Sequence, residues 1–209
     1  MKLFNKHIDQ DMINNLLNVK EHQELSAKLT TLQNEINVSF DTKIMAVSSI
    51  NDDKLAAAFA KALADTYNLN DSKCLIIDAN LYNPCLQEMI GKNDDLEVQD
   101  GDLKDGGYKM TFLDKNTATI CIDKQIYPGN AYKNKAIHNL INEHLDEYDH
   151  FIVLVPSIKH HKEVVLLGDI ITSLVLITQR NVTKKKDIFE AAQYCYLNKL
   201  PLAKTVVLK

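Results

Sequence analysis

The stretch Leu75-Ile76-Ile77-Asp78-Ala79-Asn80-Leu81-Tyr82-Asn83-Pro84 decides the fold of this chain. It begins with consecutive apolar residues, as expected for a strand that is covered on both faces of a parallel sheet. It continues into the polar residues Asp78 and Asn80 at the carboxyl end of that strand. Ligands bind at this end of the strands in open parallel sheets. The stretch therefore predicts a sheet architecture and also the edge of the sheet where a site should lie.

The rest of the chain alternates similar apolar runs with helical patterns. This alternation predicts right-handed crossovers and an α/β fold, in which a parallel sheet carries helices on both faces. We expect strands at Ile44–Ser48, Cys74–Asp78, Ala118–Ile122, Phe151–Val155, Leu174–Thr178 and Thr205–Leu208, and helices at Asp52–Tyr67, Leu86–Ile90, Tyr132–Glu147, His160–Ile170 and Thr183–Asn198.

The first forty residues contain neither glycine nor proline and have apolar residues at helical spacing. Such spacing places the apolar side chains on one face of a helix. We therefore predict an N-terminal helical arm over residues 1–40, followed by one α/β domain over residues 41–209. The second apolar stripe should be buried against that domain, and it consists of Leu25, Leu29, Leu32 and Ile36.

Composition excludes several classes of protein. The 209 residues are 45% hydrophobic and 25% charged, which is typical of a globular chain. The net charge of −4 argues against a general nucleic-acid binder. The four cysteines form no CxxC pair, so neither a zinc site nor a disulfide framework is indicated. No signal peptide or membrane span is evident, and we expect a cytoplasmic protein.

The motifs of this chain and the order in which they follow one another resemble those of the bacterial tyrosine kinases of capsule and exopolysaccharide gene clusters, which are relatives of the Min and Par ATPases. The stretch from Leu75 to Pro84 matches that family's motif LLIDADLRxP, and Tyr127-Pro128-Gly129-Asn130-Ala131 is similar to its PPNPxEL segment. The resemblance runs from about Glu24 to the last residue. It implies a P-loop NTPase-like fold of the Min/Par type.

The residues that would hold a magnesium nucleotide depart from the family pattern. The phosphate loop SSxxPGEGKS keeps Ser48, Ser49 and Lys54 but is two residues short and has no glycine. Glycines let successive backbone N–H groups wrap a phosphate, so this loop should do so poorly. Leu55 replaces the family's magnesium-binding hydroxyl residue, and Val155 replaces the aspartate of its third motif. Asp52 and Asp53 place carboxylates where the phosphates would lie.

Two further family features are incomplete. In the ring-forming motif ExxRxxR the glutamate is present as Glu24, but Ala27 and Thr30 stand at the arginine positions. Family members also carry a C-terminal tyrosine-rich tail, whereas this chain stops at Lys209. The resemblance therefore predicts a monomer or a dimer rather than a ring.

These departures predict a catalytically inactive adaptor or regulator of capsular or exopolysaccharide biosynthesis that uses no cofactor. The resemblance implies a membrane-anchored polysaccharide co-polymerase, or a kinase-family protein, as the partner. That partner would recruit the chain to the inner face of the membrane, without direct membrane insertion. An alternative is a divergent ATPase or tyrosine kinase that binds ATP and magnesium weakly through Lys54 and Asp78. A Par-like partition factor is disfavoured by the acidic charge and the single arginine, Arg180.

The remaining polar clusters favour ordinary structural roles. For Lys54, a surface lysine is favoured over an anion-binding site at the start of the following helix. For Asp78, a hydrogen-bond anchor is favoured over a metal ligand. His160 and His161 are interpreted as a solvated helix start, and 184–186 as a solvated lysine face. A mobile, solvated loop is expected for the acidic residues Asp94, Asp95, Glu97, Asp100, Asp102 and Asp105.

Overall fold

The computed structural model of this chain describes residue 31 and residues 43–91, 95–103, 106–123 and 126–208. The helical arm predicted for residues 1–40 lies outside these residues except for residue 31. The burial of its second apolar stripe and the division at residue 40 therefore stay predictions.

The described residues form eight strands, five α-helices and one short 3-10 helix. The strands are β1 (Ile44–Ser49), β2 (Cys74–Asp78), β3 (Val98–Leu103), β4 (Gly106–Phe112), β5 (Thr117–Ile122), β6 (His150–Val155), β7 (Ser173–Gln179) and β8 (Leu202–Leu208). The helices are α3 (Asp53–Leu69), α4 (Leu86–Ile90), α5 (Pro128–Lys133), α6 (Ala136–Glu143) and α7 (Lys185–Leu197), with the 3-10 helix η1 (Glu163–Leu167).

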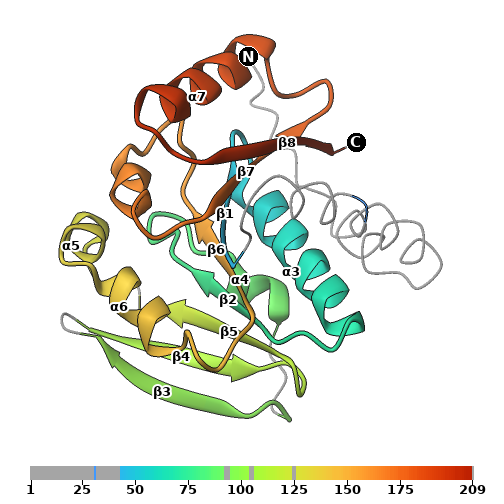
Figure 1. The fold of residues 1–209 in the computed structure, drawn as a ribbon, viewed down its shortest axis with the longest axis vertical. Coiled ribbons are helices and arrows are strands. Elements are labelled where there is room, and N and C mark those ends of the chain that lie inside the picture. Colours follow the sequence, from blue (N-terminus) through green and yellow to red (C-terminus); the bar gives the residue numbers. More distant parts are fainter. Residues whose placement is uncertain (1–30, 32–42, 92–94, 104–105, 124–125, 209) are drawn as a thin grey trace, which may run out of the picture.

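All eight strands belong to one sheet, in the order β3-β4-β5-β2-β6-β1-β7-β8. The six strands from β5 to β8 in this order run parallel. One face packs on α3 and α4, and the other packs on α5, α6, η1 and α7 (Figure 1). The predicted α/β fold, with helices on both faces of the sheet, is confirmed.

Part of the acidic stretch belongs to a β-hairpin, so the prediction of a loop was wrong for Asp100 and Asp102, whereas Asp95 and Glu97 are exposed and precede β3 without regular structure. Strands β3 and β4 pair antiparallel, and β4 pairs antiparallel with β5. Asp100 and Asp102 are two residues apart, so they lie on the same face of β3, which is an edge strand where charged side chains stay in water. Gly101 faces Tyr108 across the hairpin, and a Cβ at Gly101 would lie 2.1 Å from the tyrosine ring. Asp94 and Asp105 lie outside the described residues.

Two predicted helices have different extents in the structure. The helix expected over Tyr132–Glu147 is divided into α5 and α6, because Lys135 takes a left-handed conformation with φ of 57°. The helix expected over His160–Ile170 is a turn followed by the short η1. None of the helices within the described ranges is long and apolar enough to cross a membrane.

Candidate functional site

The loop after β1 ends in a carboxylate that caps α3. The backbone of Asp52 is extended, and its Oδ1 accepts a hydrogen bond of 3.0 Å from the Lys54 N–H. The Asp52 N–H in turn donates to Ser49 Oγ at 3.0 Å. The first N–H groups of a helix have no partner within the helix and carry partial positive charge, which is why helix N-termini bind phosphates. Here the chain places its own anion at that position.

The side chains beside this cap are engaged with neighbouring segments. Lys54 Nζ pairs with Glu88 Oε1 on α4 at 2.7 Å, and this hydrogen bond raises the pKa of Lys54. Asp53 Oδ2 accepts a hydrogen bond of 2.9 Å from the Asn83 amide in the loop after β2. The start of α3 is therefore linked both to α4 and to the loop that precedes it.

Asp78, at the end of β2, holds that same loop from inside. Its side chain is buried, and its carboxylate accepts three backbone hydrogen bonds. Oδ1 accepts from the Asn80 N–H at 3.1 Å, and Oδ2 accepts from the N–H groups of Cys85 and Leu86 at 2.9 Å each. This geometry is that of a hydrogen-bond anchor for the loop and for the first residue of α4. Lys54 and Asp78 thus contact α4 through different residues.

Burial raises the pKa of Asp78 from its ordinary value of 3.8 to about 6, against the opposing effect of the three backbone hydrogen bonds. The folded protein therefore holds this proton more tightly than the unfolded chain does. The stabilisation from Asp78 is complete below about pH 3.8 and is lost as the pH rises through about 6. We expect the loss to reach about 3 kcal/mol by neutral pH.

Urea unfolding of the wild type and of Asp78→Asn across this pH range measures the effect. The other carboxyl groups titrate in both proteins, so the difference between their free energies of unfolding reports the titration of Asp78 alone. The stability of the wild type should fall relative to that of the variant as the pH rises. A difference that is flat, or that has the opposite slope, contradicts the assignment.

The two positions that the resemblance assigns to magnesium binding are apolar and buried. Leu55 packs in the core on the α3 side of the sheet, and Val155 packs in the core on the other side. The hollow that Val155 lines together with Asp53 and Asp78 has a volume of about 10 Å³, enough for one water molecule. Among the described residues, no group of three or more histidine, cysteine or acidic side chains could hold a metal ion. These residues do not fit a magnesium nucleotide.

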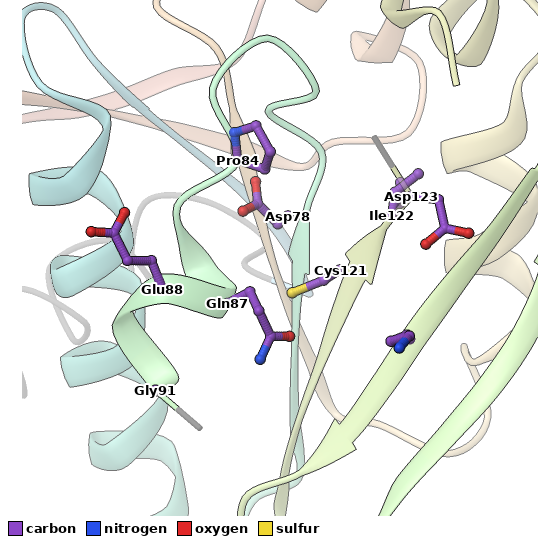
Figure 2. A pocket seen from close by; sticks show the side chains of 9 residues that line it. Asp78, Pro84, Gln87, Glu88, Gly91, Cys121, Ile122 and Asp123 are labelled. Atoms are coloured by element: carbon purple, nitrogen blue, oxygen red, sulfur yellow. The ribbon is translucent and has the colours of Figure 1, made fainter. Parts of the chain in front are cut away.

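A larger pocket of about 700 Å³ opens on the far side of α4, toward β4 and β5. Figure 2 shows the Cys121 thiol pointing toward Gln87 on α4. Burial raises the pKa of Cys121 to about 12, so this thiol is not a nucleophile at neutral pH. The residues that line the pocket are Asp78, Pro84, Gln87, Glu88, Gly91, Lys109, Cys121, Ile122 and Asp123.

The two histidines after β6 differ in their surroundings. His161 stacks on Tyr82, with 3.8 Å between the ring centroids, and the Tyr82 hydroxyl donates to Glu163 at 2.7 Å. His160 is exposed as predicted, whereas His161 is partly buried against Tyr82, and neither residue begins a helix, so the prediction of a helix start was wrong. Sequence reasoning also missed Glu88 and Asn83 as partners of the α3 start, because no local pattern relates residues thirty or more positions apart.

The comparisons agree with the fold. No family model matches this chain, and none of the curated proteins does. Among solved structures, the BceF tyrosine kinase domain superposes with a TM-score of 0.69 at 11% identity, over 89% of this chain and 76% of that chain. The VpsO kinase domain superposes with a TM-score of 0.68 at 14% identity, over 90% and 96%. A ParA family ATPase from Chlorobium tepidum superposes with a TM-score of 0.60 at 13% identity, over 80% and 73%. These TM-scores show that the chain shares the fold of tyrosine kinase domains and ParA ATPases. At identities this low, the fold alone is shown.

Proposed function

We propose that this chain is a catalytically inactive, tyrosine-kinase-like adaptor or regulator in capsular or exopolysaccharide biosynthesis. It acts through its surfaces and not through phosphoryl transfer. The observation that carries this proposal is the Asp52 carboxylate, which caps the N-terminus of α3 where a phosphate would bind.

Electrostatics around the cap supports the proposal. A phosphate that approached the start of α3 would meet the carboxylates of Asp52 and Asp53, and it would have to displace the hydrogen bond to the Lys54 N–H. Lys54 offers one flexible ammonium, which is already paired with Glu88 and cannot replace the fixed N–H groups of a phosphate loop. The side chains of Leu55 and Val155 offer no ligand atom to magnesium, so the phosphate charge would stay unneutralised.

Calorimetric titration with Mg-ATP tests this proposal. Each charge-assisted hydrogen bond missing from the loop is worth about 1.5–3 kcal/mol. A total loss of about 4 kcal/mol converts a micromolar dissociation constant into a millimolar one. We therefore expect no binding at micromolar concentrations and no rise in melting temperature with Mg-ATP or Mg-ADP.

The alternative function, a divergent ATPase or kinase, makes the opposite prediction. It requires micromolar Mg-ATP binding that Lys54→Met abolishes. Lys61→Met is the matched control, because Lys61 lies on the same helix and pairs with Asp65 at its surface. Binding that is lost in the first variant and kept in the second would return the chain to the enzyme class.

The partner that the resemblance implies is a membrane-anchored polysaccharide co-polymerase or a kinase-family protein. In this proposal the chain is cytoplasmic, and that partner recruits it to the membrane. Co-purification with the cytoplasmic segment of the co-polymerase encoded in the same gene cluster tests the pairing directly. If the two proteins do not associate, and no kinase of the cluster binds either, the adaptor role is wrong.

We expect no octameric ring. The family's ring depends on glutamate–arginine pairing, and here Ala27 and Thr30 stand at the arginine positions. These positions lie outside the described residues, so this expectation is based on their chemistry alone. Light scattering at micromolar concentration should report a monomer or a dimer. An octamer-sized species would contradict this expectation.

A further inference from the structure

The outer face of α7 carries apolar side chains in water. Phe189 is 68% exposed, Tyr196 is 83% exposed and Leu197 is 69% exposed. Ala191 and Cys195 on the same helix are buried and define its inner face. At 100° per residue the three exposed side chains lie on the side of the helix opposite that inner face. These three side chains form an apolar ridge on the outer face of the 13-residue helix, which the exposed Gln193 interrupts between Phe189 and Leu197.

Basic residues surround this ridge. Lys184, Lys185 and Lys186 begin the helix and are exposed, and Arg180 and Lys199 flank it. Residues 180–208 contain six basic and two acidic residues, a net charge of +4. The whole chain carries −4, so the remainder carries −8. Positive charge is therefore concentrated in the region that contains α7, and the rest of the chain is negatively charged.

The two acidic residues of this region offset part of its positive charge, and both are already counted in the net charge of +4. Asp187 pairs with Lys159 at 3.0 Å, and Glu190 pairs with Lys186 at 3.6 Å. Figure 1 shows α7 at the outer end of the molecule, beyond β7 and β8, with the β3–β4 hairpin at the opposite end. That hairpin carries Asp100 and Asp102. The acidic end therefore points away from whatever α7 meets.

We propose that the ridge and its flanking cations, together the α7 surface, bind an anionic lipid bilayer. The α7 surface consists of Arg180, Lys184, Lys185, Lys186, Phe189, Tyr196, Leu197 and Lys199. Aromatic and leucine side chains enter the boundary between headgroups and acyl chains, and lysines attract anionic headgroups. The helix lies on the bilayer and does not span it. This inference does not depend on the proposed function, since it uses no residue of the nucleotide region.

Charge decides between a bilayer and a second copy of this chain. A two-fold dimer through α7 would bring two regions of net charge +4 together around their apolar ridges, and like charges repel. An anionic bilayer instead attracts the α7 surface and repels the rest of the molecule, which fixes the orientation of the protein.

Co-sedimentation of the full chain with phosphatidylcholine vesicles, with and without phosphatidylglycerol, tests the proposal. We expect binding to the anionic vesicles only, weakened by added salt. Each of Lys185→Gln and Lys186→Gln should weaken binding about 5-fold, which corresponds to about 1 kcal/mol per lysine at the surface. Phe189→Gln should weaken it about tenfold through lost apolar burial.

The matched control is Leu69→Gln combined with Lys73→Gln, which changes an exposed leucine and an exposed lysine on another part of the surface. This control should bind as the wild type does. If Phe189→Gln does not fold by circular dichroism, Tyr196→Gln probes the same ridge at a more exposed position. Failure of the wild type to bind anionic vesicles overturns the proposal, as does binding that the α7 variants leave unchanged. A dimer of the wild type that Phe189→Gln dissociates would assign the α7 surface to a second copy and would also overturn it.

Discussion

Asp78→Ala should lower the free energy of unfolding by about 4 kcal/mol at pH 5, because three buried N–H donors lose their acceptor at a cost of about 1–3 kcal/mol each. The donors belong to Asn80, Cys85 and Leu86, and the carboxylate is their common acceptor. At this pH the carboxyl of Asp78, with a pKa of about 6, is mostly protonated. The relief of a buried charge therefore offsets little of the loss, whereas at neutral pH it would offset more.

Urea unfolding with matched variants measures this loss. Asp78→Asn keeps an oxygen that can accept from the start of α4, so it should lose about half as much. Asp53→Ala removes a carboxylate with one exposed hydrogen bond to Asn83 and should cost less than about 1 kcal/mol. If Asp78→Ala costs no more than Asp53→Ala, the three hydrogen bonds do not hold the loop.

Val155→Asp should also destabilise the protein by about 4 kcal/mol, and it should not create nucleotide binding. This substitution restores the acidic residue that the resemblance places in the third motif. Val155 is 1% exposed, and the hollow beside it holds about one water molecule, so a new carboxylate would be buried without a partner. It would share that hollow with Asp78, and two close carboxylates disfavour ionisation of both.

Two further measurements separate burial of charge from a simple packing defect. Val155→Thr has nearly the same shape and should cost less than half as much as the aspartate. The loss in Val155→Asp should shrink at low pH, where the new carboxyl is protonated. If magnesium restores the stability of Val155→Asp, the prediction is wrong. That result would mean that one substitution is enough to recreate a metal site.

The sheet was predictable because its central strands are continuous apolar runs that end at polar residues. All six expected strands are present, and Cys74–Asp78 has the expected bounds. Strands β3 and β4 escaped prediction because their composition is atypical. Val98–Leu103 has two aspartates and a glycine among six residues, and glycine and aspartate are depleted in strands. Pairing with β4 and a place at the edge of the sheet outweigh that composition.

At the candidate site the sequence predicted residue types but not their partners. The anchor role weighed for Asp78 agrees with its three backbone hydrogen bonds. Asp52 was expected only to repel phosphates, whereas it caps α3 with the extended backbone that is usual for an N-cap residue. The pair of Lys54 with Glu88 depends on the packing of α3 against α4, which no local pattern encodes.

The position of β1 in the sheet has a consequence for biosynthesis. This strand is the first of the described elements to leave the ribosome, yet both of its neighbours come from much later in the chain. Met45 pairs with Ile152 in β6 and with Ser173 in β7. At a synthesis rate of about 5–20 residues per second, an apolar strand of this kind waits about 5–20 s before β6 exists to pair with it. Pairing between segments so distant also makes folding slow once the chain is complete. Newly made β1 should therefore be a binding site for chaperones, and expression of the protein should depend on them more than its modest size suggests.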